Sequence, residues 1–164
     1  MMPVLIYEET LQCPICKRNT LKHSEYVYDS GPGGILNITV FSCSSCGFNE
    51  KLVKPFEESK PIEIRFEVKS EDDLNVLVYR SPTAQLEIPE LGISTEPGEL
   101  YQGIITTVEG LIEDIIDTIG DFCDEECIKK LQDAKEGKIK FTIILQDPSG
   151  LSFVRSEKAT VTQL

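Results

Sequence analysis

The sequence lacks the residue patterns that common catalytic sites use. A single histidine, His23, stands in 164 residues, and its place between two cysteine pairs leaves no partner for a serine or cysteine nucleophile. The Gly-x-Ser-x-Gly elbow of hydrolases and the Gly-rich loops that bind phosphates are both missing. Carboxylates are plentiful, but nothing distinguishes a catalytic pair from an acidic surface. We therefore expect that the protein is not an enzyme.

Long apolar runs are also missing. No run reaches the roughly 18 residues that a membrane-spanning helix needs, so we expect no membrane partner. The first ten residues, MMPVLIYEET, contain no basic segment and only a very short apolar run. Secretory signals have both features. The sequence therefore predicts a cytoplasmic protein.

Basic residues are scarce, with 16 Lys and Arg against 28 Asp and Glu and a net charge of -12. Residues 1–54 contain equal numbers of bases and acids, so the whole acidic excess lies in residues 55–164. Phosphate backbones are bound by Lys and Arg, so we expect such a chain to bind nucleic acids poorly. An acidic domain is expected to bind a basic protein surface instead.

The six cysteines form three pairs in the sequence, and two of these pairs have the spacing Cys-x-x-Cys. Thiolates bind zinc tetrahedrally, and two such turns complete a closed site of four sulfurs. Without a secretory signal, this pattern favours metal over disulfides. We predict one structural zinc ion bound by Cys13, Cys16, Cys43 and Cys46. Gly47 follows the last ligand and allows the backbone to approach the sulfur closely.

An iron site of the rubredoxin type would use the same four sulfurs, and an electron carrier therefore remains an alternative. Rubredoxins are rich in aromatic residues around the metal, whereas this chain has no tryptophan. His23 is expected at the surface and not among the ligands. Cys123 and Cys127 are expected to be half-buried small apolar groups, because a disulfide at this spacing inside a regular helix is geometrically unfavourable.

The residues between the two cysteine pairs predict a β-hairpin. EYVY and ILNITVF are rich in β-branched and aromatic residues, and the DSGPGG between them is a turn. A hairpin with a cysteine pair at each of its ends is a zinc ribbon, which we place at residues 1–54. The segment PFEESKP reads as a linker to a second domain, residues 55–164.

The second domain is predicted to be mainly β. Residues 62–68, IEIRFEV, alternate between apolar and charged and indicate a half-buried strand. LNVLVYRS is expected to pair with it. KIKFTIILQ is a further strand, and DPSG is a turn that leads into a returning strand, LSFVRS.

A helical hairpin interrupts these strands. From Thr106 onward the apolar residues recur at helical spacing, and Thr106 with Glu109 fits a capping box. A second helix covers about residues 124–136 and ends before Gly137, a predicted C-cap. The fold class is therefore mainly β with a helical hairpin (α+β), inserted at about residues 106–136.

Eight acids and no base occur between residues 109 and 128. They are Glu109, Glu113, Asp114, Asp117, Asp121, Asp124, Glu125 and Glu126. One interpretation is a solvated outer face, and the other is a docking surface for a basic partner.

Several strings in this order resemble the ZPR-one zinc finger family, over about residues 11–154. They are CPICKRNTL, FSCSSCGFNE, YRSPTAQLEIPELGI, GIITTVEGLIEDI and LQDPSGLSFV. The resemblance implies a zinc ribbon followed by a double-stranded β-helix domain that carries a helical hairpin. Eukaryotic members have two such modules, and this chain resembles the single-module form of archaea.

The resemblance also implies a function in protein binding, as an adaptor or folding chaperone for translation elongation factor one-alpha. Candidate contact residues come from the family strings and from the acidic helix. They are Thr106, Thr107, Glu109, Asp147, Ser149, Ser152, Glu113 and Asp117. A nucleic-acid-binding zinc ribbon of the transcription-factor type is an alternative, which only Lys17, Arg18 and Lys22 support.

Overall fold

The computed structural model describes residues 2–55, 60–98 and 102–164. The chain divides into two compact units, Met1–Lys60 and Pro61–Leu164. The boundary that the sequence suggests, between residues 54 and 55, falls six residues earlier, at the end of a strand. The middle of the expected linker PFEESKP lies outside the described residues. Independent folding of the two units remains a prediction.

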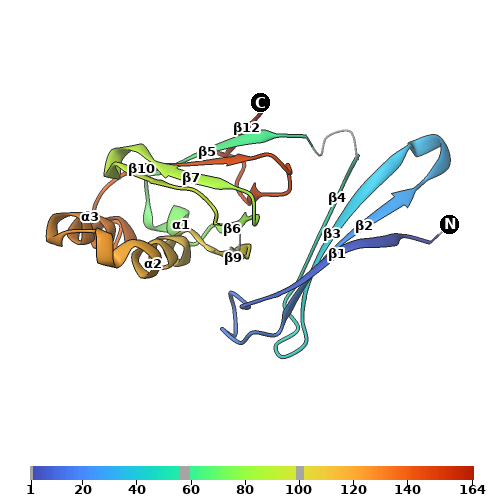
Figure 1. The fold of residues 1–164 in the computed structure, drawn as a ribbon, viewed down its shortest axis with the longest axis horizontal. Helices are drawn as coiled ribbons and strands as arrows, with labels where there is room; N and C mark the ends of the chain where they lie inside the picture. The colour runs from blue at the N-terminus through green and yellow to red at the C-terminus, as the bar shows by residue number, and fades with distance from the viewer. Residues whose placement is uncertain (1, 56–59, 99–101) are drawn as a thin grey trace. The chain divides into compact units, whose positions relative to one another are not determined.

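The first unit is an antiparallel sheet of four strands (Figure 1). Its strands are β1 (Val4–Leu11), β2 (Leu21–Asp29), β3 (Ile35–Cys43) and β4 (Asn49–Pro55), in that order across the sheet. Strands β2 and β3 form the predicted hairpin, with the short helix η1 (Gly31–Gly33) in its turn. Strands β1 and β4, which the sequence analysis did not predict, add one neighbour on each side.

The buried face of this sheet has a small apolar core. In β3 the side chains of Asn37, Thr39, Phe41 and Cys43 alternate inward, and their partners on β2 include Glu25, His23 and Leu21. Most of these buried positions are polar. Because so little apolar surface is removed from water, the unit needs a further source of stability.

The second unit is built from two antiparallel sheets (Figure 1). The larger sheet has the order β12-β5-β10-β7-β8, and the smaller has the order β11-β6-β9. The larger comprises β12 (Thr160–Gln163), β5 (Ile62–Val68), β10 (Phe141–Asp147), β7 (Gln85–Ile88) and β8 (Ile93–Thr95). The smaller comprises β11 (Phe153–Val154), β6 (Leu77–Arg80) and β9 (Ile104–Thr107). Short helices α1 (Glu71–Leu74) and η3 (Pro89–Leu91) connect strands. This arrangement is a jelly roll, the double-stranded β-helix that the resemblance implies.

Two predicted strand pairings are wrong. Strand β5 pairs with β10 and β12, and not with β6, which pairs with β9 and β11. Strand β11 likewise leaves β10 after the DPSG turn and joins the other sheet. In addition, the expected strand LNVLVYRS begins later than predicted. Its first residue, Leu74, is the last residue of helix α1, and β6 starts at Leu77. A jelly roll sends sequence neighbours into opposite sheets, so local alternation identifies the strands but not their partners.

The helical hairpin is present between β9 and β10. It consists of α2 (Val108–Ile119), η4 (Gly120–Phe122) and α3 (Glu125–Lys135), and α2 and α3 lie side by side (Figure 1). The predicted capping box is wrong by one residue, because Thr106 is buried in β9 and Thr107 is the N-cap. Gly137 follows the hairpin with a φ of 78°, as expected for a residue just beyond a helix.

The core of the second unit lies between the sheets and α2. Four residues of α2 at helical spacing contribute to it, namely Val108, Leu111, Ile112 and Ile115. Phe66 on β5 and Phe141 on β10 pack in the same cluster. The hairpin is therefore fixed to the jelly roll by its apolar face, while six of the eight acids between residues 109 and 128 are exposed.

Candidate metal centre and partner surface

The four cysteines of the first unit lie on two loops with the same backbone geometry. In each loop the carbonyl of the first cysteine accepts a hydrogen bond from the amide four residues later, Lys17 or Gly47, at 3.0 Å. The amides of Cys13 and Cys43 donate at 2.8 Å to the carbonyls five residues later. Lys17 and Gly47 have positive φ angles of 65° and 80°. Each loop is therefore a tight turn that presents two sulfurs in one direction.

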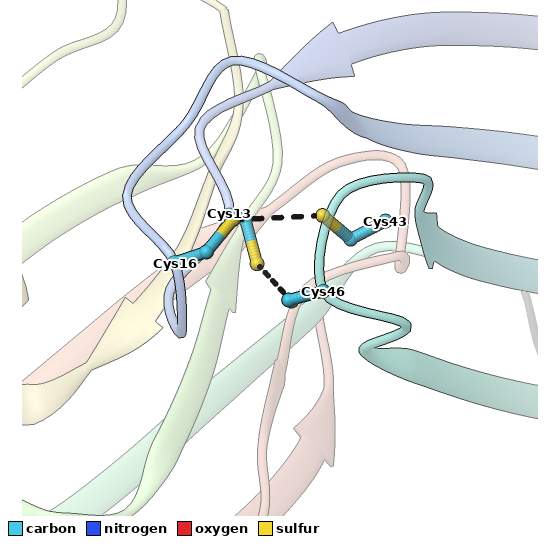
Figure 2. Close-up of side chains that lie close together, drawn as sticks. All are labelled: Cys13, Cys16, Cys43 and Cys46. Carbon is cyan, nitrogen blue, oxygen red and sulfur yellow. Dashed lines mark hydrogen bonds between the residues drawn. The ribbon is translucent and has the colours of Figure 1, made fainter.

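The register of the sheet brings the two loops together. Leu21 pairs with Cys43, so the loop before β2 and the loop after β3 lie at the same end of the hairpin. Figure 2 shows the cysteines of one loop facing those of the other. The Sγ atoms of Cys13 and Cys46 are 3.6 Å apart, and those of Cys16 and Cys43 are 3.7 Å apart.

These distances fit a zinc ion. Four sulfurs at about 2.3 Å from zinc form a tetrahedron with edges of about 3.8 Å, and the ligand atoms of all four cysteines lie within 4.8 Å of one another. A disulfide would need sulfurs about 2 Å apart. The cluster is consistent with one structural zinc ion, which would hold the two loops together.

Polar groups contact two of the four sulfurs. The hydroxyl of Thr20 lies 3.2 Å from the Sγ of Cys43, and the amide of Ile15 donates to the Sγ of Cys13 at 3.4 Å. The Thr20 hydrogen bond lowers the pKa of the Cys43 thiol to about 6. Because four protein sulfurs complete a tetrahedral shell, no position remains for a water or substrate, and such a site is structural.

His23 is buried, which corrects the expectation that it lies at the surface. Its Nδ1 is 3.0 Å from Oε1 of Glu9 on β1, and its Nε2 is 2.5 Å from Oε2 of Glu25, which lies on β2 with His23. The ring stacks on Phe41 with centroids 4.5 Å apart. The hydroxyl of Thr39 donates to Glu25 at 2.7 Å. Only the register of β1, β2 and β3 brings these groups together, so local sequence signals could not reveal them.

The pH dependence of the first unit follows from this arrangement. Burial alone would lower the pKa of His23, but hydrogen bonds with Glu25 and Glu9 outweigh it, so the pKa is raised above 6.5. A pKa raised by folding stabilises the folded state fully below the unfolded value, and the contribution is lost as the pH rises through the folded value.

We therefore expect that His23→Gln is most destabilising at pH 6 and that its difference from wild type shrinks as the pH rises above 6.5. Thermal unfolding of the full chain, followed by NMR signals of β2 and β3, measures this difference. If the difference in stability between His23→Gln and wild type stays constant from about pH 6 to 9, the claim that His23 is charged in the folded protein is wrong.

Asp147 is the centre of a buried network in the second unit. Its carboxylate accepts hydrogen bonds from the amide of Ser149 at 2.8 Å, the amide of Ser152 at 2.9 Å and the hydroxyl of Thr83 at 3.0 Å. The hydroxyls of both serines also donate to it. Burial would raise the pKa of Asp147, but bonds from Ser152 and Ser149 outweigh it and lower the pKa. The network joins the DPSG turn to the loop after β6.

The start of α2 has a comparable local explanation. The hydroxyl of Thr107 accepts a hydrogen bond from the amide of Gly110 at 3.1 Å. A side chain at Gly110 would collide with the hydroxyl of the buried Thr106. The string TTVEG therefore combines a helix cap with a close contact that only glycine permits.

The candidate contact residues fall into two groups by exposure. Asp147, Ser152 and Thr106 are buried, and Thr107, Glu109 and Ser149 are half-buried. Only Glu113 and Asp117 are exposed, both on α2. Glu113 forms an ion pair with Lys135 of α3 at 2.7 Å. The exposed members therefore lie on α2, and the buried members lie in β9 and around the turn that follows β10.

Cys123 and Cys127 belong to the second unit and form a disulfide, with Cα atoms 5.3 Å apart. Their spacing predicts no such bond inside a regular helix. It forms because Cys123 precedes α3 and has an extended backbone.

Together these features define a class of protein in which a zinc ribbon with four cysteines precedes a jelly roll with a helical hairpin. A comparison with known protein families gives a more specific assignment, because the family model of the ZPR1 jelly-roll domain matches residues 72–163 of this chain. The chain belongs to the ZPR1 family.

Relatives in archaea match most of the chain. An uncharacterised ZPR1-like protein of Methanocaldococcus jannaschii is 33% identical over 161 residues, which cover 91% of this chain and 81% of the relative. A similar protein of Pyrococcus horikoshii is 30% identical over 93% of this chain and 75% of the relative.

Eukaryotic relatives are longer. The zinc finger chaperone zpr1 of Schizosaccharomyces pombe is 33% identical over 70% of this chain, but the match covers 28% of that protein. The names of the relatives describe zinc finger proteins or chaperones, and the matches indicate no catalytic family. In the described part of the chain, no helix has the length and hydropathy needed to cross a membrane.

Proposed function

We propose that this protein is a zinc-stabilised binding module that acts in the cytoplasm as an adaptor or folding chaperone for translation elongation factor one-alpha. The observation that carries the proposal is membership of the ZPR1 family, in which a fission yeast relative is named a chaperone. The closed metal cluster and the absence of a matched catalytic family support a binding role.

The acidic face of the hairpin is the proposed contact surface. Asp117 and Asp121 are exposed and lie near its tip, and Glu113 is exposed beside them on α2. Six of the eight acids between residues 109 and 128 are exposed. A surface of one charge sign accelerates encounter with a partner of the opposite sign and favours that partner over others.

The remaining candidate residues act through the fold of the second unit. Thr106 and Thr107 fix the start of α2 through the close contact and the helix cap. Asp147, Ser149 and Ser152 hold the loop between β10 and β11. Substitutions there are expected to change binding through the stability of the domain, whereas substitutions of exposed acids act directly.

Charge reversal tests the proposed surface. We expect the double variant Asp117→Lys, Asp121→Lys to bind purified elongation factor one-alpha at least about tenfold more weakly at low salt, because its charges repel a basic partner. The double variant Asp72→Lys, Glu157→Lys is a matched control, since it changes the net charge equally and both of its acids are exposed and lie outside the hairpin. Equal affinities of the double variant and the control, or no binding of the wild type at low salt, would overturn the proposal.

The alternatives predict other outcomes. The nucleic-acid alternative depends on bases near the first cysteine pair, and one of them, Lys22, forms an ion pair with Glu8 at 3.3 Å. A gel shift with single-stranded and duplex RNA and DNA distinguishes this alternative. An iron-loaded electron carrier would be red, whereas a zinc protein is colourless.

A further inference from the structure

The tip of the helical hairpin contains a pair of cysteines that the metal cluster does not use. Cys123 lies between η4 and α3 with φ −113° and ψ 120°, and Cys127 is the third residue of α3. Their Cα atoms are 5.3 Å apart, within the usual range for a disulfide. The bond closes a loop of only a few residues. Such a short loop constrains the unfolded chain little, so the bond is a weak structural brace.

Two hydrogen bonds hold the two cysteines near each other whether or not the S–S bond is present. The side chain of Asp124 accepts from the amide of Cys127 at 2.8 Å, and its carbonyl accepts from the amide of Ile128 at 2.9 Å. Both bonds form the start of α3 and would persist in the reduced protein. Because the thiols stay close, the disulfide can form and open without refolding of the hairpin.

The pair is accessible to small reagents. Both cysteines are only half-buried against the core, and Phe122 beside them is 92% exposed. Cys127 lies in the first turn of an 11-residue helix, where the helix dipole stabilises a thiolate. Cys127 is therefore the better attacking group of the two.

We propose that Cys123 and Cys127 form a reversible redox pair that exchanges with low-molecular-weight disulfides, so that the bond between them at the tip of the hairpin forms or opens. In the closing direction, the thiolate of Cys127 attacks a sulfur of the reagent, forms a mixed disulfide and releases one reagent thiolate. The thiolate of Cys123 then attacks the Cys127 sulfur and releases the second one. Two electrons pass to the reagent, and the two cysteine protons end on the two released thiols.

The charges around the pair indicate which reagents react fastest. Asp121, Asp124, Glu125 and Glu126 are exposed around it. The bases nearest in sequence are Lys129 and Lys130. Lys129 forms an ion pair with Asp133 at 3.3 Å, and Lys130 forms one with Glu126 at 3.8 Å. The local field is therefore negative, so the pair favours cationic disulfides such as cystamine over the anionic glutathione disulfide.

Trypsin digestion allows the pair to be measured separately from the zinc ligands. Residues 81–128 contain no Lys or Arg, so one tryptic peptide, residues 81–129, contains Cys123 and Cys127 and no other cysteine. The zinc-loaded full chain is equilibrated with buffers of varied ratio of reduced to oxidised glutathione, alkylated and digested. Mass spectrometry then counts the alkyl groups on this peptide.

We expect a single transition between a doubly alkylated and an unmodified peptide within the range of the glutathione buffers, reached from either direction. Full alkylation in the most oxidising buffer, or none in excess reductant, would overturn the proposal. Cys123→Ser should trap a mixed disulfide at Cys127, because no second thiol resolves it. A failure to form this mixed disulfide would show that Cys127 is not the attacking group and would also count against the proposal.

Kinetics test the charge preference. Relative to an unfolded peptide of residues 81–129, we expect the reduced protein to favour cystamine over glutathione disulfide by roughly tenfold at low ionic strength. Added salt should remove most of this preference, and Asp121→Asn with Glu125→Gln should reduce it. A preference equal to that of the peptide would contradict the proposed role of the acids.

Discussion

Replacing Cys43 with Ser is expected to unfold the ribbon unit while leaving the jelly roll largely folded. Structural zinc contributes on the order of 10 kcal/mol to folding in small metal-binding domains. The apolar core of this unit is small, and His23, Glu25, Asn37 and Thr39 occupy much of its buried face. Such a unit cannot replace the metal with apolar burial.

Amide hydrogen exchange of the full chain measures this effect. The amides of β2 and β3 should exchange much faster in the variant, while those of β5 and β10 stay protected. Cys127→Ser is the matched control, because it removes a cysteine sulfur that is not part of the metal cluster and should leave β2 and β3 protected. If the variant loses protection throughout the chain, the two units depend on each other, and the predicted domain division is wrong.

Replacing Asp147 with Ala is expected to destabilise the jelly roll by about 3–5 kcal/mol, because buried donors lose their shared acceptor. The variant would leave three donors without this acceptor, namely the amides of Ser149 and Ser152 and the hydroxyl of Thr83. This loss is a large part of the 5–15 kcal/mol that typically separates folded from unfolded domains.

Urea unfolding of the full chain, followed through the jelly-roll strands, measures the loss. Asp121→Ala removes the same charge from an exposed position and should change stability by less than about 0.5 kcal/mol. If Asp147→Ala behaves like this control, the carboxylate does not organise the turn, and its place in the family string needs another explanation.

The cysteine cluster could be predicted because its signal is local. Each cysteine pair is a complete short turn, and the strand-rich segment between the pairs fixes their distance. The same holds for the helical hairpin, whose apolar spacing and terminal Gly137 are read directly from the sequence. The start of α2 differs by one residue in its cap, because the burial of Thr106 favours a strand position over the cap.

Features that depend on long-range register could not be predicted. The burial of His23 results from pairing with β1 and β3, and neither Glu9 nor Glu25 indicates by itself that it faces the ring. Likewise, β5 pairs with β10, which follows it by more than seventy residues. Prediction of the disulfide would have required the first residue of α3. If the helix began two residues earlier, Cys123 would lie inside it.

Native mass spectrometry of an equimolar mixture with elongation factor one-alpha, at low ionic strength, tests the zinc assignment and the proposed function together. We expect a one-to-one complex in which this chain carries one zinc ion in place of thiol protons, and we expect added salt to reduce the complex. A chain that carries iron or no metal would contradict the zinc assignment. A zinc-loaded chain that forms no complex would contradict the proposed function.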